Sequence, residues 1–102
     1  MKKILITGAN GQLGQAILEQ SKNYNEIECF FVTRNELDIT NEDLVKNYFQ
    51  DTTFDFVVNC AAYTAVDKAE DHPYDAFLVN AKATEFLAKA TNEHNIPFIH
   101  IS

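Results

Sequence analysis

Short apolar runs recur along this chain at intervals typical of a sheet with buried strands. Nearly continuous runs, as expected for strands covered on both faces, occupy residues 3–7, 27–33, 54–59 and 97–101. A shorter fifth candidate is Leu37-Asp38-Ile39. The pattern therefore predicts strands spread over the whole sequence.

Between these runs the apolar residues repeat at helical spacing. The first helical pattern covers residues 12–21, and the second opens with the capping sequence Thr40-Asn41-Glu42-Asp43 and continues to Phe49. The third begins at about Tyr74 and runs to about His94. Because strands alternate with helices, we expect a parallel α/β sheet with right-handed crossovers.

All three glycines of the chain lie in one turn between the first strand and the first helix. The stretch is Gly8-Ala9-Asn10-Gly11-Gln12-Leu13-Gly14. Glycine permits a positive φ and a close approach of the backbone to a ligand, and the start of the helix offers unpaired N–H groups and the positive end of its dipole. Strand, glycine turn and helix in this order predict a phosphate-binding site. The spacing is G-x-x-G-x-x-G rather than G-x-G-x-x-G, so a tight turn without a ligand remains the alternative.

Size and charge narrow the classes of protein that remain. At 102 residues the chain is one domain at most, and its 46% of hydrophobic residues is ordinary for a globular protein. The net charge of −7, with no basic cluster, argues against a nucleic-acid surface but not against an anion held by backbone amides. No apolar run is long enough to span a membrane or to form a signal peptide, so we expect a cytoplasmic protein.

The cysteines and histidines predict no metal site. Cys29 and Cys60 lie in apolar runs, so we expect free, buried thiols in a reducing compartment, with no disulfide between them. His72, His94 and His100 are isolated in the sequence, and each is assigned a surface or core role.

The end of the sequence suggests an incomplete fold. Residues 97–102 form a predicted strand that is followed by neither a turn nor a helix. A parallel strand is normally covered by its next crossover, so we expect a fragment, truncated after the fifth strand. The bare strand edge would favour low stability or self-association into a homo-oligomer.

Three stretches follow predicted strands, at the sheet edge where open α/β folds bind ligands. They are Thr7 to Gly14, Asp38-Ile39, and Asn59-Cys60-Ala61-Ala62-Tyr63-Thr64. Together they resemble the extended short-chain dehydrogenase/reductase family, in which T-G-x-x-G-x-x-G, an acidic-aliphatic pair and N-x-A-A/G line the cofactor groove. The resemblance covers the whole chain, and Asn59 to Glu70 and Phe98 to Ser102 are similar to the family's nucleotide-sugar reductases.

The resemblance implies a Rossmann-like, three-layer α/β/α sheet with strand order 3-2-1-4-5, in which Leu37-Asp38-Ile39 is strand 3. Residues 1–102 would be the N-terminal part of an NAD(P)-binding domain, without its catalytic and substrate-binding portion. The implied cofactor-binding residues are Gly8, Asn10, Gly11, Gln12, Leu13, Gly14, Arg34, Asp38, Ile39, Cys60, Ala61, Ala62, Tyr63, Thr64 and Asn80.

The implied roles are chemically consistent. Backbone amides around Asn10 to Leu13 would hold the pyrophosphate, Asp38 would accept hydrogen bonds from the adenine amino group, and Ile39 would pack on the ring. Ala61-Ala62 would let the cofactor lie flat, while Tyr63-Thr64 would approach the nicotinamide ribose. Three of these residues also have a structural alternative: Asp38 could be a loop cap, Tyr63 a packed aromatic and Asn80 a satisfied buried amide.

Arg34 bears on the choice of cofactor. The position about 20 residues past the glycine motif normally carries an acidic residue that binds the ribose 2′-hydroxyl. Here the count reaches Arg34, which can pair with a 2′-phosphate instead. We therefore expect NADPH to be preferred, with NADH still possible, unless Arg34 only pairs with a neighbour such as Glu36.

No catalytic residue is expected within this chain. The family's proton transfer uses Y-x-x-x-K, and no tyrosine here has a lysine four positions later. In the resembling reductases the catalytic hydroxyl residue directly follows the serine that matches Ser102. The resemblance implies an intact enzyme that transfers a hydride from NADPH to a dTDP-linked 4-keto sugar. A nucleotide-sugar epimerase or dehydratase, and a non-catalytic regulatory subunit that keeps the cofactor fold, remain alternatives.

Overall fold

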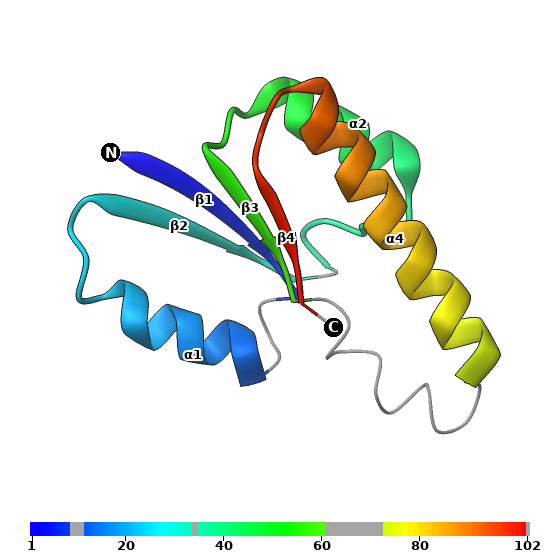
Figure 1. The fold of residues 1–102 in the computed structure, drawn as a ribbon, viewed down its shortest axis with the longest axis horizontal. Helices are drawn as coiled ribbons and strands as arrows, with labels where there is room; N and C mark the ends of the chain where they lie inside the picture. The colour runs from blue at the N-terminus through cyan, green and yellow to red at the C-terminus, as the bar shows by residue number, and fades with distance from the viewer. Residues whose placement is uncertain (9–11, 34, 61–72, 102) are drawn as a thin grey trace.

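The structure is a computed structural model that describes residues 1–8, 12–33, 35–60 and 73–101. For residues 73–80 it describes the backbone only. Strands and helices alternate along these residues (Figure 1). In chain order they are β1 (Lys2–Thr7), α1 (Gln12–Ser21), β2 (Ile27–Val32), α2 (Glu42–Asp51), β3 (Phe56–Asn59), α4 (Pro73–Glu93) and β4 (Phe98–His100). The predicted alternation is confirmed. Among the described helices, none is both long and apolar enough to cross a membrane.

The four strands form one parallel sheet in the order β2-β1-β3-β4. Leu5 pairs with Phe30 on one side and with Val57 on the other, and Val57 pairs with Phe98. Paired residues of parallel strands point to the same face, so this row marks one face of the sheet. The predicted Rossmann-like parallel fold is therefore confirmed, and these four strands follow one another in the expected order.

The additional strand predicted at Leu37-Asp38-Ile39 is wrong. The backbone N–H of Leu37 donates to the carbonyl of Thr33 at 2.9 Å. Asp38 Oδ1 accepts hydrogen bonds from both the backbone N–H and the hydroxyl of Thr40, at 3.0 and 2.6 Å. These local bonds fold the segment into turns, whereas Leu37 and Ile39 are still buried. The apolar residues anchor a connection to α2 rather than a strand.

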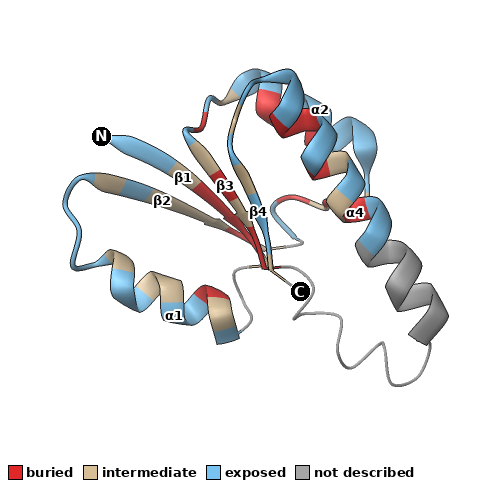
Figure 2. Cartoon of the chain, viewed as in Figure 1, coloured by how far each residue is buried: buried red, intermediate tan, exposed pale blue. Residues whose placement is uncertain are grey.

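Helices α2 and α4 pack against each other over the face that carries Leu5 (Figure 1). Helix α2 begins after Asn41, whose side-chain oxygen accepts a hydrogen bond from the backbone N–H of Leu44 at 3.1 Å. After α4, Asn95 takes a φ of 58° and turns the chain toward β4. Figure 2 shows buried residues gathered where these helices face the strands. The core they form contains Leu5, Val32, Leu37, Ile39, Val45, Phe49, Phe54, Val57, Ala83, Leu87 and Ala90.

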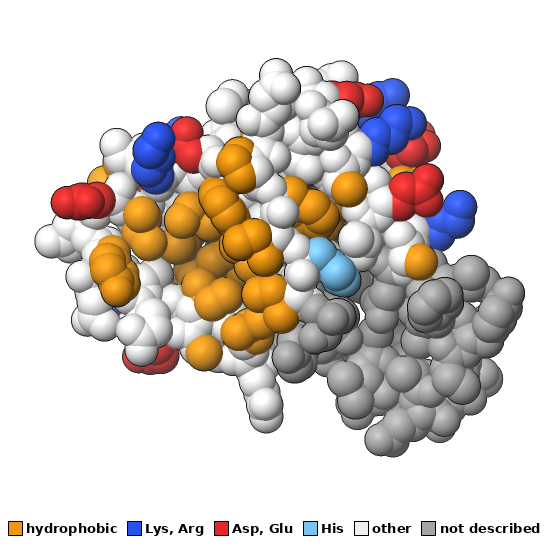
Figure 3. All heavy atoms as spheres, viewed as in Figure 1, with side chains coloured by type: hydrophobic (Ala, Val, Ile, Leu, Met, Phe, Trp, Pro, Cys, Tyr) orange, Lys and Arg blue, Asp and Glu red, His pale blue; other side chains and the backbone are white. Residues whose placement is uncertain are grey.

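Helix α1 lies on the opposite face, so the layers are α/β/α as predicted. Between α1 and the sheet is an open hollow of about 300 Å³. It is lined by Ile4, Ile6, Ala16, Ile17, Gln20, Ser21, Tyr24, Ile27, Cys29 and Val58. Figure 3 shows hydrophobic side chains gathered in a patch on this side of the molecule. Within the described residues, α1 is the only helix that covers this face.

Candidate cofactor-binding site

The carboxyl ends of the strands meet at one edge of the sheet. The backbone N–H of Cys60, just past β3, donates to the carbonyl of Thr7 at 2.9 Å. The backbone N–H of Ile101, just past β4, donates to the carbonyl of Asn59 at 3.1 Å. Strand pairing thus continues to the last residue of each strand, which gives the edge a defined geometry. Ligands of open α/β sheets bind at this edge.

The glycine turn begins at this edge, directly after β1. Gly8 has a φ of 70°, in the left-handed region where a Cβ is disfavoured. Helix α1 starts at Gln12, with Leu13 half-buried, and Gly14 is buried in its first turn. Asn10 and Gly11, also predicted to bind the cofactor, lie outside the described residues.

Beyond β2, the chain forms a turn that ends in Asp38. The hydroxyl of Thr33 donates to Glu36 Oε1 at 2.9 Å and helps to close this turn. The Asp38 carboxylate caps the following turn through its hydrogen bonds with Thr40. This is the loop-cap role that was the structural alternative to adenine binding. Ile39 is only 8% exposed and belongs to the core. Contacts of Asp38 and Ile39 with a base remain predictions, and Arg34 lies outside the described residues.

A polar network that sequence reasoning missed crosses the same edge. The hydroxyl of Thr7 donates to Asn59 Oδ1 at 2.7 Å, and Asn59 Nδ2 lies 3.1 Å from His100 Nδ1. Thr7 and Asn59 are each 1% exposed. His100 is exposed on β4, in keeping with the surface role that the sequence suggested, and it also contacts Asn59, which the sequence did not indicate. The sequence did contain a signal for this network. In β1, β3 and β4 alike, an apolar run ends in a polar residue, namely Thr7, Asn59 and His100.

Cys60 lies just past the end of β3, and its contact with a cofactor remains a prediction. Its side chain is fully buried, and burial raises the pKa of its thiol. Burial likewise raises the pKa of Cys29, although a hydrogen bond with Ser21 opposes this effect. Both cysteines are free, and β1 lies between their strands. Neutral thiols at these positions act as small hydrophobic groups rather than nucleophiles.

The remaining predicted residues follow β3 or lie in α4. Ala61, Ala62, Tyr63 and Thr64 lie outside the described residues. Asn80 is in the first half of α4, where the structure describes the backbone but not the side chain. Their predicted contacts with a cofactor remain predictions.

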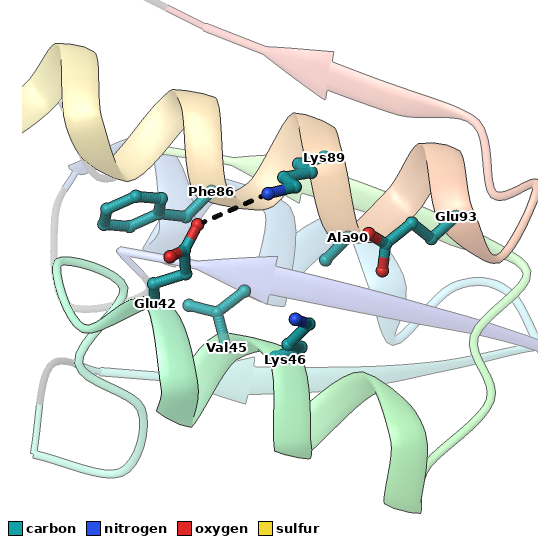
Figure 4. A pocket seen from close by; sticks show the side chains of 7 residues that line it. All are labelled: Glu42, Val45, Lys46, Phe86, Lys89, Ala90 and Glu93. Atoms are coloured by element: carbon teal, nitrogen blue, oxygen red, sulfur yellow. Dashed lines mark ion pairs between the residues drawn. The ribbon is translucent and has the colours of Figure 1, made fainter.

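The hollow between α2 and α4 is a helix seam rather than a ligand site. It is small and lined by Glu42, Val45, Lys46, Phe86, Lys89, Ala90 and Glu93 (Figure 4). Lys89 Nζ lies 3.8 Å from Glu42 Oε2 across it. Both side chains are more than half exposed, at 59% and 51%, so this ion pair contributes little to stability.

The described residues fit a dinucleotide cofactor. The left-handed Gly8 and the buried Gly14 leave room where a Cβ would intrude, and the start of α1 presents its N–H groups beside them. The hydrogen bond from Thr7 to Asn59 joins the ends of β1 and β3 in addition to the backbone pairing of these strands. The site combines a glycine turn, predicted to bind an anion, with a preformed strand edge.

A parallel sheet in this order, with a glycine turn after its central strand β1, defines a Rossmann-like α/β protein. The chain belongs to the family described as the RmlD substrate binding domain, which matches residues 1–102. A dTDP-4-dehydrorhamnose reductase from Aggregatibacter actinomycetemcomitans is 37% identical over 102 residues, which are 100% of this chain and 35% of that protein. The corresponding reductase from Mycolicibacterium smegmatis is 42% identical over 101 residues, or 99% of this chain and 30% of that protein.

Solved structures of proteins with the same name are also similar to this chain. A dTDP-4-dehydrorhamnose reductase from Clostridium acetobutylicum has a TM-score of 0.82 and 43% identity, over 94% of this chain and 34% of that one. The Bacillus anthracis enzyme, solved in complex with NADP, has a TM-score of 0.85 and 33% identity, over 100% of this chain and 36% of that one. The chain thus spans about a third of the length of the relatives that it matches.

Proposed function

We propose that this chain is the cofactor-binding part of an NADPH-dependent dTDP-4-dehydrorhamnose reductase. The observation that carries the proposal is the glycine turn, with Gly8 at a φ of 70° between the central strand and the start of α1. The family membership of all 102 residues supports it, as does the NADP bound to the Bacillus anthracis relative.

The described residues would divide the binding of the cofactor among the four strand ends. The turn after Thr7 and the N-terminus of α1 would hold the pyrophosphate, and Asp38 would face the adenine. The ends of β3 and β4 would orient the nicotinamide end. When bound, the reduced nicotinamide supplies the hydride for the ketone carbon of the sugar. Proton transfer to the ketone oxygen is assigned to residues outside this chain, because the chain contains no Y-x-x-x-K.

The test uses the full-length protein that contains this chain. We expect NADPH absorbance to fall on addition of dTDP-4-dehydrorhamnose, with dTDP-L-rhamnose as the product. The 102-residue chain is the matched control and should show no turnover, even where calorimetry detects weak NADP binding. A full-length protein that isomerises the sugar without consuming NADPH would instead be an epimerase. Turnover by the 102-residue chain would contradict the expectation that this chain contains no catalytic residue.

Arg34 tests the cofactor preference separately. Arg34→Ala in the full-length protein should reduce the preference for NADPH over NADH about tenfold or more, because a charged hydrogen bond to the 2′-phosphate is lost. Glu36→Gln is the matched control, since it removes a neighbouring charge that could pair with Arg34. The ratio of the dissociation constants for NADPH and NADH is the measurement. An unchanged ratio in Arg34→Ala would show that this residue does not read the 2′-phosphate.

A further inference from the structure

A row of polar side chains crosses three strands where the sheet ends. Thr7 pairs with Asn59 in the register of β1 and β3, and Asn59 pairs with His100 in that of β3 and β4. Their side chains lie on the same face of the sheet and form one hydrogen-bonded chain. Asn59 is the central member, and it is 1% exposed. Thr7 and His100 therefore each contribute a hydrogen bond to a largely buried amide.

The distances indicate the direction of each hydrogen bond. Thr7 Oγ1 lies 2.7 Å from Asn59 Oδ1, a separation typical of O–H···O, but 3.4 Å from the carbonyl of Val58. The Thr7 proton therefore lies toward Asn59, whose oxygen accepts it. The Asn59 amide nitrogen is then directed at His100 Nδ1, 3.1 Å away. Because the amide nitrogen is a donor, Nδ1 must be the acceptor and the ring proton must lie on Nε2.

We propose that His100 is a positioning residue of the cofactor site, acting as an Nε2–H tautomer that orients Asn59 through Nδ1. The inference rests on the proposed function, since it assigns the nicotinamide end to these strand ends. With Nδ1 as acceptor, the Asn59 oxygen is held toward Thr7, directly before the glycine turn. One side chain on β4 thus extends a side-chain link across the ends of β1, β3 and β4, beside the backbone pairing that already joins these strands.

The position of His100 determines which kinetic step should depend on it. The glycine turn follows β1, and β3 separates β1 from β4. Binding of the pyrophosphate at the turn is therefore two strands away from His100. Misplacement of the β4 end would therefore affect the alignment of the reacting groups more than the affinity for the cofactor.

The test compares His100→Asn with His100→Leu in the full-length protein. Asn and Leu have similar size and shape, but only Asn keeps an acceptor near the place of Nδ1. We expect His100→Leu to lower kcat about tenfold while KM for NADPH changes less than about twofold, as for lost alignment. His100→Asn should retain kcat within about twofold of the parent. His94→Asn, at an exposed histidine outside the network, is the control for loss of a histidine side chain.

A second measurement reads the tautomer directly. In ¹⁵N spectra of the full-length protein at neutral pH, the His100 signals, assigned by their loss in His100→Leu, should show a protonated Nε2 and an unprotonated Nδ1. A protonated Nδ1 would overturn the inference, and so would equal kcat values in His100→Asn and His100→Leu. A parent protein without reductase activity would instead refute the proposed function, so the two failures are distinguishable.

Discussion

The two faces of the sheet are packed in different ways. On one face, α2 and α4 cover the row Phe30, Leu5, Val57 and Phe98, and both central residues are fully buried. Phe54 lies at the centre of an aromatic cluster there, with ring centroids 5.6, 5.8 and 5.9 Å from those of Phe30, Tyr48 and Phe49. Edge-to-face and stacked rings at these distances add to the energy of burial alone.

The opposite face has one helix and a hollow. The corresponding row of paired strand residues on this face is Phe31, Ile6, Val58 and Ile99. Ile6 is 1% exposed beside α1, whereas Ile99 on β4 is 45% exposed. The difference teaches that the same apolar strand pattern can be fully packed on one face and only partly covered on the other. Stability and tolerance to substitution should therefore differ between the faces.

The largest expected effect comes from truncating the centre of the aromatic cluster. Phe54→Ala should lower the free energy of unfolding by about 3–5 kcal/mol, because it removes three ring contacts and opens a cavity. Phe31→Ala is the same change on the other face, where the side chain is half-buried, and should cost about 1–2 kcal/mol. Urea unfolding of the 102-residue chain measures both.

Phe54→Leu provides a milder variant in case Phe54→Ala does not fold. It should still be more destabilising than Phe31→Leu. Equal losses for the two leucine variants would contradict the contrast between the faces.

Enlarging a side chain on each face should change stability by an intermediate amount. Val57 and Val58 are neighbours in the sequence that face opposite sides of the sheet. Val57 is 0% exposed beneath α2 and α4, and Val58 lines the hollow beside α1. Val57→Phe should destabilise the chain by about 1–3 kcal/mol through overpacking, whereas Val58→Phe should change stability by less than about 0.5 kcal/mol. Thermal unfolding of the two variants side by side is the measurement. A Val58→Phe variant as unstable as Val57→Phe would show that the hollow closes in solution.

The smallest effect concerns the pH dependence of stability. Burial raises the pKa of the Cys60 thiol above its ordinary value of 9.0. The neutral thiol therefore contributes stability that is present below that value and lost as pH rises through the pKa of the folded state. Unfolding free energies measured from pH 8 to 10 should fall more steeply for the parent than for Cys60→Ala.

Tyr48 supplies an internal reference for this measurement. Its pKa is raised by burial and then by the negative charge of Glu36, so it contributes a decline of the same sign in both proteins. The difference between the parent and Cys60→Ala isolates the thiol. Identical slopes would mean that Cys60 is not protected from solvent in the folded chain.

Local sequence patterns predicted most of the secondary structure. Continuous apolar runs identified β1, β2, β3 and β4, and the alternation with helices predicted that they are parallel. The failure at Leu37-Asp38-Ile39 has a specific cause. Asp38 closes a turn with Thr40, and this local competition is stronger than the preference of two apolar residues for a strand.

The sequence by itself determined β1 to β4, the helices between them and the glycine turn, because strand period, helix period and positive φ depend on neighbouring residues. It also placed Thr7 and Asn59 at strand ends. Only the tertiary structure decided that α2 and α4 complete one face while α1 leaves a hollow on the other. It also decided that His100 meets Asn59, since these residues lie 41 positions apart and pairing between strands brings them together. Such contacts depend on strand order and register, which no local pattern encodes.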